Sequence, residues 1–299
     1  MKSILEICLA FGLLATLCST TVILNSEDNK KIANIGPRYN SPVLHTLNDS
    51  SLRCGEVLNS TSGGISYKAF EPIEPNERCV WIIRGGNTDG FNVNILYLGY
   101  ESNPNGTQLI ASCLRHYFEA FHIILNQTGP NPYLSFCNVL MITFSSGSNV
   151  GNSTGFVLQY EALGGGAVSP RSTDHIIQTG DPGVIKYPES AAEYDNNEFT
   201  TFVFEPTQNI FSPGKRINLI YIKGLMETSF DVLRVYVFNS NSIEPEKWEY
   251  KGVIDDNHNQ TEIIFNQDLI LVEFHSDRNN PGTGFQFIHT TSGVEGCNL

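Results

Sequence analysis

The chain has 299 residues, of which 40% are hydrophobic and 16% are charged, and its formal net charge is −13. The length predicts about two domains, and this much apolar material excludes wholesale disorder. A strongly acidic surface repels phosphate backbones, so we expect no nucleic acid among the partners. Acidic clusters attract cations or basic proteins instead.

Residues 1–20 have the order of a secretory signal peptide. Lys2 precedes an almost wholly apolar run, Ile4–Cys18, in which Glu6 is the one charge, and small residues follow. The run is too short for a comfortable membrane span, and no later stretch approaches the roughly 18 apolar residues that a span needs. The C-terminal tail, 293–299, has no hydrophobic segment of the kind that directs a lipid anchor. We therefore expect a secreted, extracellular protein with no membrane span.

Residues 21–53 lack periodicity and predict an extended N-terminal segment. From Cys54 onward, short β-rich runs alternate with Gly, Pro, Asn and Asp, as strands and turns do. The glycine-rich stretch 164–174 then predicts a linker. The strands expected before it are Cys79–Arg84, Phe91–Leu98, Tyr117–Leu125, Val139–Phe144 and Phe156–Tyr160.

After the linker the same texture resumes, without long helical patterns. Many short strands separated by turn signals predict an all-β protein built from antiparallel β-sandwiches. The expected strands are Val184–Tyr187, Phe199–Phe204, Ile217–Ile222, Leu233–Phe238, Thr261–Phe265, Leu269–Phe274 and Phe285–His289.

The two halves are related to each other. Ile142–Gly147 resembles Val272–Asp277, and a Thr-Gly-Phe triplet follows each of these segments. Upstream, Cys79-Val80-Trp81 corresponds to Thr200-Thr201-Phe202. A repeat of this length indicates a duplicated domain. We therefore expect two tandem modules, 54–163 and 175–292.

The order of these motifs resembles that of the CUB domain, a family of extracellular β-sandwiches. This resemblance implies two CUB-like modules of the jelly-roll type, with Trp81 and Phe202 in the buried aromatic position. Matching segments in the first module are Cys54-Gly55, Cys79-Val80-Trp81, Cys113 to His116, Phe144 to Gly147 and Gly155-Phe156. Matching segments in the second are Gly183 to Ile185, Tyr194, Phe202, Phe230-Asp231, Phe274 to Asp277 and Gly284-Phe285.

Five cysteines remain once the signal peptide is removed, and an oxidising compartment favours pairing the four in the first module. Four cysteines can pair in three ways, of which we prefer the sequential one, Cys54–Cys79 and Cys113–Cys137. The second module has no internal cysteine. Cys297 is left over, either as a free thiol or as an intermolecular disulfide that would link two copies into a homodimer.

Six sequons for N-linked glycosylation occur in the chain, slightly more than the roughly four that this composition gives by chance. They support secretion only together with the signal peptide. The acceptor residues are Asn48, Asn59, Asn105, Asn126, Asn152 and Asn259.

The resemblance also implies a calcium site at one end of the second sandwich. Asp231 and Asp277 match the family's two aspartates, Glu227 is a looser match for its glutamate, and Asn279 or Asn280 would add a carbonyl oxygen. Calcium requires six to eight oxygen ligands, so clustered carboxylates suit it. The alternative is that these are ordinary loop carboxylates that cap turns.

In the first module we interpret His116 and Gly147 as replacements of the two aspartates, which leaves Glu101 alone. One carboxylate does not make a site for a hard cation, and a neutral imidazole suits other metals better. We therefore expect calcium in the second module only.

No catalytic motif stands out. Gly-x-Ser-x-Gly and His-Glu-x-x-His are both missing, as is a phosphate-binding glycine loop, so we expect no enzyme. The leading interpretation is a secreted protein that binds an extracellular protein or glycan partner, with the acidic loop of the second module ordered by calcium. The alternative is a structural or matrix component cross-linked through Cys297.

Overall fold

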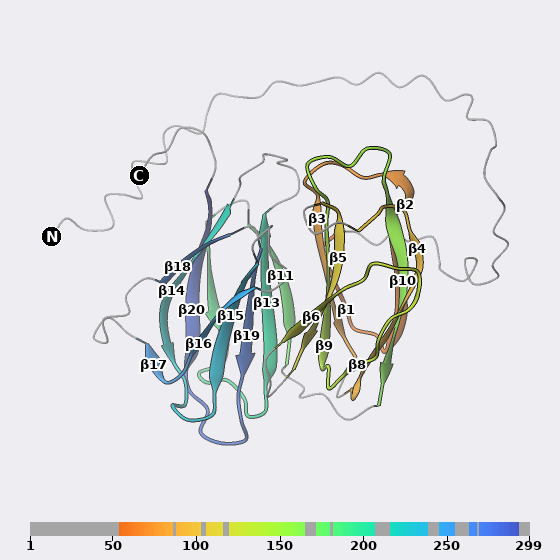
Figure 1. Ribbon diagram of the computed structural model, residues 1–299. Coiled ribbons are helices and arrows are strands. Elements are labelled where there is room, and N and C mark those ends of the chain that lie inside the picture. The colour runs from red at the N-terminus through yellow and green to blue at the C-terminus, as the bar shows by residue number, and fades with distance from the viewer. Residues whose placement is uncertain are drawn as a thin grey trace. The chain divides into compact units, whose positions relative to one another are not determined.

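The computed structural model describes residues 54–85, 88–102, 106–115, 120–164, 172–179, 182–206, 216–238, 245–254, 263–267 and 269–292. The strands form two groups, which follow each other along the chain (Figure 1). Among the described residues no helix is long and apolar enough to cross a membrane.

The first sandwich pairs two five-stranded sheets, ordered β1-β3-β9-β5-β6 and β2-β10-β4-β7, with β8 also pairing with β4. Its strands are β1 Glu56–Leu58, β2 Ser62–Pro72, β3 Arg78–Arg84, β4 Gly90–Leu98, β5 Gln108–Leu114, β6 Phe121–Ile124, β7 Gly129–Pro130, β8 Leu134–Ser135, β9 Val139–Ser145 and β10 Thr154–Leu163.

The second sandwich repeats this arrangement, with sheets ordered β11-β13-β19-β15-β16 and β12-β20-β14-β17, and with β18 also pairing with β14. Its strands are β11 Asp174–Thr179, β12 Gly183–Tyr187, β13 Phe199–Pro206, β14 Arg216–Leu225, β15 Val232–Phe238, β16 Glu246–Tyr250, β17 Val253–Ile254, β18 Ile263–Gln267, β19 Leu269–His275 and β20 Gly284–Ser292. The duplication expected from the sequence is therefore present in the topology.

Each sandwich departs from a purely antiparallel pattern at one place. β1 pairs in parallel with β3, and β11 pairs in parallel with β13. In both cases the intervening strand belongs to the opposite sheet, so the chain crosses the sandwich twice and returns in its original direction. β11 begins at Asp174, the last residue of the predicted linker.

Aromatic side chains fill both cores. Trp81 is fully buried and its ring meets Phe156 edge-on at 5.7 Å between centroids. Phe202 takes the corresponding place in the second sandwich and meets Phe285 at 5.8 Å. Such edge-to-face pairs stabilise a core beyond the area they bury. The expected core role of Trp81 and Phe202 is confirmed.

The Gly-Phe motif of each sandwich has a steric reason. A Cβ atom on Gly155 would lie 1.8 Å from the carbonyl oxygen of Tyr67, and one on Gly284 would lie 1.8 Å from that of Tyr187. Gly284 also has a φ of +84°, which favours glycine. The glycine lets two strands of the second sheet approach at the point where the following phenylalanine enters the core.

Candidate calcium site in the second sandwich

Three carboxylates meet at one end of the second sandwich. Ligand oxygens of Glu227, Asp231 and Asp277 all lie within 4.8 Å of one another. Glu227 follows β14, Asp231 directly precedes β15, and Asp277 follows β19. Because β15 and β19 are antiparallel and Val232 pairs with His275, the start of one strand lies beside the end of the other. The strand register thus brings together residues that are 46 positions apart in the chain.

Tyr194 holds two of these residues in place. Its ring is buried against Phe274, with 4.8 Å between centroids. Its hydroxyl donates to Oδ2 of Asp231 and accepts the backbone N–H of Glu227 at 3.1 Å. Tyr194 is one of the positions that match the family pattern, and its hydroxyl lies at the centre of the polar contacts.

The remaining contacts order the loop after β19. The backbone N–H of Asp277 donates to Oδ1 of Asp231 at 2.8 Å, and that of Asn279 donates to Oδ1 of Asp277 at 2.7 Å. Burial raises the pKa of Asp231 above its ordinary value, because the charged form loses its hydration. Oε2 of Glu227 is buried and has no hydrogen-bond partner among the described residues.

This arrangement suits a hard cation. Three carboxylates so close together repel one another, and a buried carboxylate oxygen without a donor is costly. A divalent cation with a preference for oxygen would offset both effects. Asn279 contributes a backbone N–H to the loop, and its role as a carbonyl ligand stays a prediction.

The same loops in the first sandwich share the backbone pattern but keep only one of the three acids, Glu101. Ser146 accepts the N–H of Glu77 there, just as Ser276 accepts the N–H of Glu198 in the second sandwich. By this equivalence Gly147 stands where Asp277 does. Equivalent backbone bonds, Ile73 N–H to Ser153 and Tyr194 N–H to Gly282, put Ile73 in the place of Tyr194.

The interpretation of His116 as the counterpart of Asp231 is wrong. Gln108 pairs with Ser145 in the first sandwich as Val232 pairs with His275 in the second. The residue before β5, Thr107, is therefore the counterpart of Asp231. His116 itself lies outside the described residues. The motif comparison failed because it was anchored on Cys113, whereas the strand register decides which residue reaches this end of the sheet.

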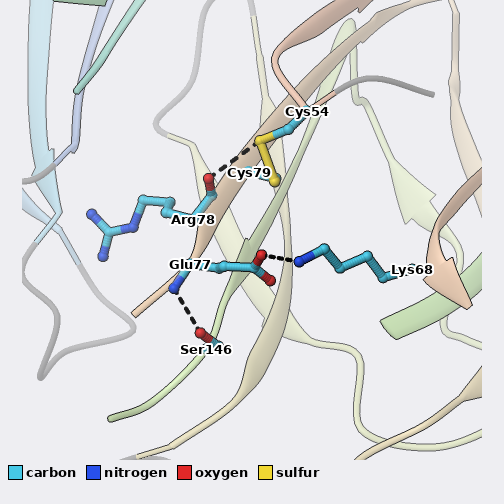
Figure 2. Close-up of a disulfide and its surroundings, with 6 residues drawn as sticks. All are labelled: Cys54, Lys68, Glu77, Arg78, Cys79 and Ser146. Carbon is cyan, nitrogen blue, oxygen red and sulfur yellow. Dashed lines mark hydrogen bonds and ion pairs between the residues drawn. A yellow bond between two sulfur atoms is a disulfide. The ribbon is translucent and has the colours of Figure 1, made fainter. Parts of the chain in front are cut away.

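The Cys54–Cys79 disulfide is present and joins the start of the first module to β3 (Figure 2). Beside it, Lys68 forms an ion pair with Glu77 (Figure 2). Cys113 and Cys137 are both buried and are not joined to each other, so their disulfide stays a prediction.

Three of the sequon asparagines, Asn59, Asn126 and Asn152, are exposed, as glycosylation requires. The other three, Asn48, Asn105 and Asn259, lie outside the described residues, as do Cys297 and the predicted signal peptide. Trp248 lies in the hairpin strand β16, and His275 is a buried strand residue.

No family model matches the chain. Cubilin from Canis lupus familiaris is 28% identical over 244 residues, which cover 79% of this chain and 6% of cubilin. Among solved structures, the CUB1-EGF-CUB2 domain of human MASP-1/3 is 16% identical with a TM-score of 0.33, covering 78% of this chain and all of that one. The full extracellular region of zebrafish Gpr126/Adgrg6 is 12% identical with a TM-score of 0.28, covering 80% of this chain and 36% of that one. The duplicated sandwich, the order of the motifs and the similarity to cubilin together support the CUB-domain family, with two CUB-like modules in this chain.

Proposed function

We propose that this chain is a secreted, non-catalytic protein that binds an extracellular partner through a calcium site formed by Glu227, Asp231 and Asp277. The observation that carries the proposal is the convergence of the three carboxylates, with one oxygen of Glu227 buried and unpartnered. Calcium takes six to eight oxygens, so three carboxylates leave positions for loop carbonyls, water and a ligand from the partner.

Calcium would order the two loops that carry these acids. Without it, carboxylate repulsion favours loop conformations in which the acids move apart. With it, the loops after β14 and β19 keep one shape, and a carboxylate oxygen facing solvent can accept a charge-assisted hydrogen bond from a lysine of the partner. The resemblance to calcium-binding CUB domains supports this mode of docking.

The surroundings of the site favour a protein partner over a glycan. Phe230, which directly precedes Asp231, is 66% exposed. Leu225, at the end of β14, pairs with Val253 of β17, and both are exposed. Exposed apolar residues beside a charged site are typical of protein-binding surfaces.

Capture of partners from the native extracellular fluid tests the proposal. The intact protein, immobilised in calcium, is expected to retain a partner that a chelator releases and that added calcium restores. Glu227→Gln is expected to abolish this retention. Glu101→Gln, at the equivalent position of the first module, is the matched control and should retain the partner. Capture that is indifferent to the chelator would contradict the proposal.

A further inference from the structure

The central strands of one sheet in each sandwich are buried on both faces. Every residue of β15 and β19 is buried, as are all residues of β9 except the last. A sheet that covers a core on one side and meets water on the other should alternate buried and exposed residues. The outward faces of the sheets containing β9 and β19 are therefore covered by something.

The outward face of the sheet containing β9 packs against the outward face of the sheet containing β19. One buried cluster draws on both sheets, with Val80, Ile82, Leu114, Val139 and Met141 from the first sandwich and Phe199, Val203, Tyr236, Phe238, Leu269 and Leu271 from the second.

Polar contacts complete the interface. Arg84 forms a bidentate ion pair with Asp174, in which Nε lies 2.5 Å from Oδ2 and Nη2 lies 2.7 Å from Oδ1. Nη2 of Arg84 also donates to the carbonyl oxygen of Phe199 at 2.8 Å. The side chains of Arg84 and Asp174 are 9% and 1% exposed. The hydroxyl of Tyr236 accepts the backbone N–H of Ala120 at 3.2 Å. The two sandwiches therefore share a packed and partly charged interface.

Glu273 lies on the same face of β19 as Leu271 and is completely buried. Its Oε2 is 3.3 Å from Nε2 of His275, and its Oε1 has no hydrogen-bond partner among the described residues. Thr201 of β13 and Arg234 of β15 are its cross-strand neighbours.

The charged and titratable groups around Glu273 come from several strands. Arg234 is already held by Glu249 of β16, at 3.1 Å. Asp174 of β11 bonds to the hydroxyl of Thr201. The other groups facing Glu273 are Tyr236 on β15, Lys247 on β16, His275 on its own strand and Arg115 of the first sandwich.

We propose that Glu273 is a proton-controlled latch between the two sandwiches, neutral while their faces are packed together and ionised when they separate. Removal of the first sandwich would expose the outer face of β19 to water, where a carboxylate is stable. With the faces packed, an ionised Glu273 would be a completely buried charge, and one of its carboxylate oxygens would have no hydrogen-bond partner among the described residues.

The direction of the pH dependence follows. Burial is the main cause that raises the pKa of Glu273 to about 8 from an ordinary value of 4.5. In separated sandwiches the pKa returns toward the ordinary value, so the packed state binds one more proton between these two limits. Each unit by which the pH rises in this window lowers the equilibrium constant for packing of the two sandwiches by up to tenfold. Below the window this equilibrium constant is at its highest.

The test uses the full chain at fixed millimolar calcium from pH 5 to pH 9. Small-angle X-ray scattering is expected to show the wild type expanding as the pH rises, with a parallel fall in its thermal midpoint. Glu273→Gln should stay compact over the whole range. Asp174→Asn, which removes a different buried acid of the interface, should weaken the packing at every pH and keep the pH dependence. A wild-type profile no steeper than that of Glu273→Gln would overturn the proposal.

A second measurement keeps the proposal falsifiable if Glu273→Gln does not fold. Carboxyl carbon NMR of wild-type protein labelled selectively at glutamate should show one group that titrates near pH 8. If all glutamates titrate in the ordinary acidic range, Glu273 is ionised in the packed state and the latch does not exist.

Discussion

Replacement of Tyr194 by phenylalanine removes one hydroxyl that makes two hydrogen bonds, one buried and one partly buried. The hydroxyl donates to the carboxylate of Asp231 and accepts the N–H of Glu227. A hydrogen bond to a charged group contributes about 1.5–3 kcal/mol and a neutral one about 0.5–1.5 kcal/mol, and the carboxylate of Asp231 would remain buried without a replacement donor. We therefore expect Tyr194→Phe to lower the free energy of unfolding by about 2–3 kcal/mol.

Tyr100→Phe is a matched control in the first sandwich. Tyr100 is 8% exposed and its hydroxyl has no hydrogen-bond partner among the described residues. The loss of an unpartnered buried hydroxyl should change stability by less than about 0.5 kcal/mol, or increase it.

Thermal unfolding of both variants with a calcium chelator present measures the difference. For a chain of this size 1 kcal/mol corresponds to a shift of about 2–4 °C, so Tyr194→Phe should lower the midpoint by about 4–12 °C. Equal shifts for Tyr194→Phe and Tyr100→Phe would refute the argument that the Tyr194 hydroxyl supports the acidic loops.

Three further predictions concern both sandwiches. Burial lowers the pKa of His122 to about 4, so between pH 8 and pH 5 this side chain is protonated more readily in the unfolded state than in the folded state. The free energy of unfolding of the wild type should therefore fall by at most about 2 kcal/mol over this range. In urea titrations, His122→Asn should remove this fall in the free energy of unfolding. An unchanged dependence on pH in the variant would count against the prediction. Gly284→Ala should destabilise the chain by at least about 3 kcal/mol, because its Cβ has no room. Gly151→Ala, at a positive φ in open space, should cost about 1–2 kcal/mol, and equal losses in denaturant would contradict the steric argument. Peptide mapping of the secreted protein under non-reducing conditions should show Cys113 linked to Cys137, and alkylation of both thiols before reduction would disprove the link.

The fold was largely predictable because most of its strands have a recognisable local sequence pattern. Val139–Phe144 and Leu269–Phe274 are short apolar runs between turn residues, and each became a central strand. β2 and β5 were not predicted. Ser62–Pro72 mixes glycine, serine and charged residues, and its strand conformation depends on pairing with β10 rather than on its own composition.

The site was predictable where a residue lies next to a recognisable strand end. Asp277 lies two residues after the end of a clear strand, and Asp231 directly precedes another. Glu227 was found despite its loose spacing. In the first sandwich, the motif predicts His116 as the counterpart of Asp231 because of its neighbouring cysteine. The pairing of Gln108 with Ser145 shows that Thr107 is the counterpart of Asp231. Strand register is a tertiary property and is not visible in a short motif.

The packing between the sandwiches had a sequence signal that strand prediction alone does not use. β15 and β19 are apolar on both faces apart from Arg234, Glu273 and His275, which indicates strands covered on both sides. The sequence does not reveal what covers the outer face, because the covering residues belong to the first sandwich, as with Ala120, which lies 116 positions from Tyr236.

Calcium titration of the full chain tests the central claim most directly. Isothermal calorimetry should show one binding site in the wild type and in Glu101→Gln, and none in Glu227→Gln. Calcium at 100 times its dissociation constant should stabilise the wild type by about 2.7 kcal/mol, seen as a higher thermal midpoint. Absence of both heat and stabilisation at millimolar calcium in the wild type would contradict the assignment of Glu227, Asp231 and Asp277 as a calcium site.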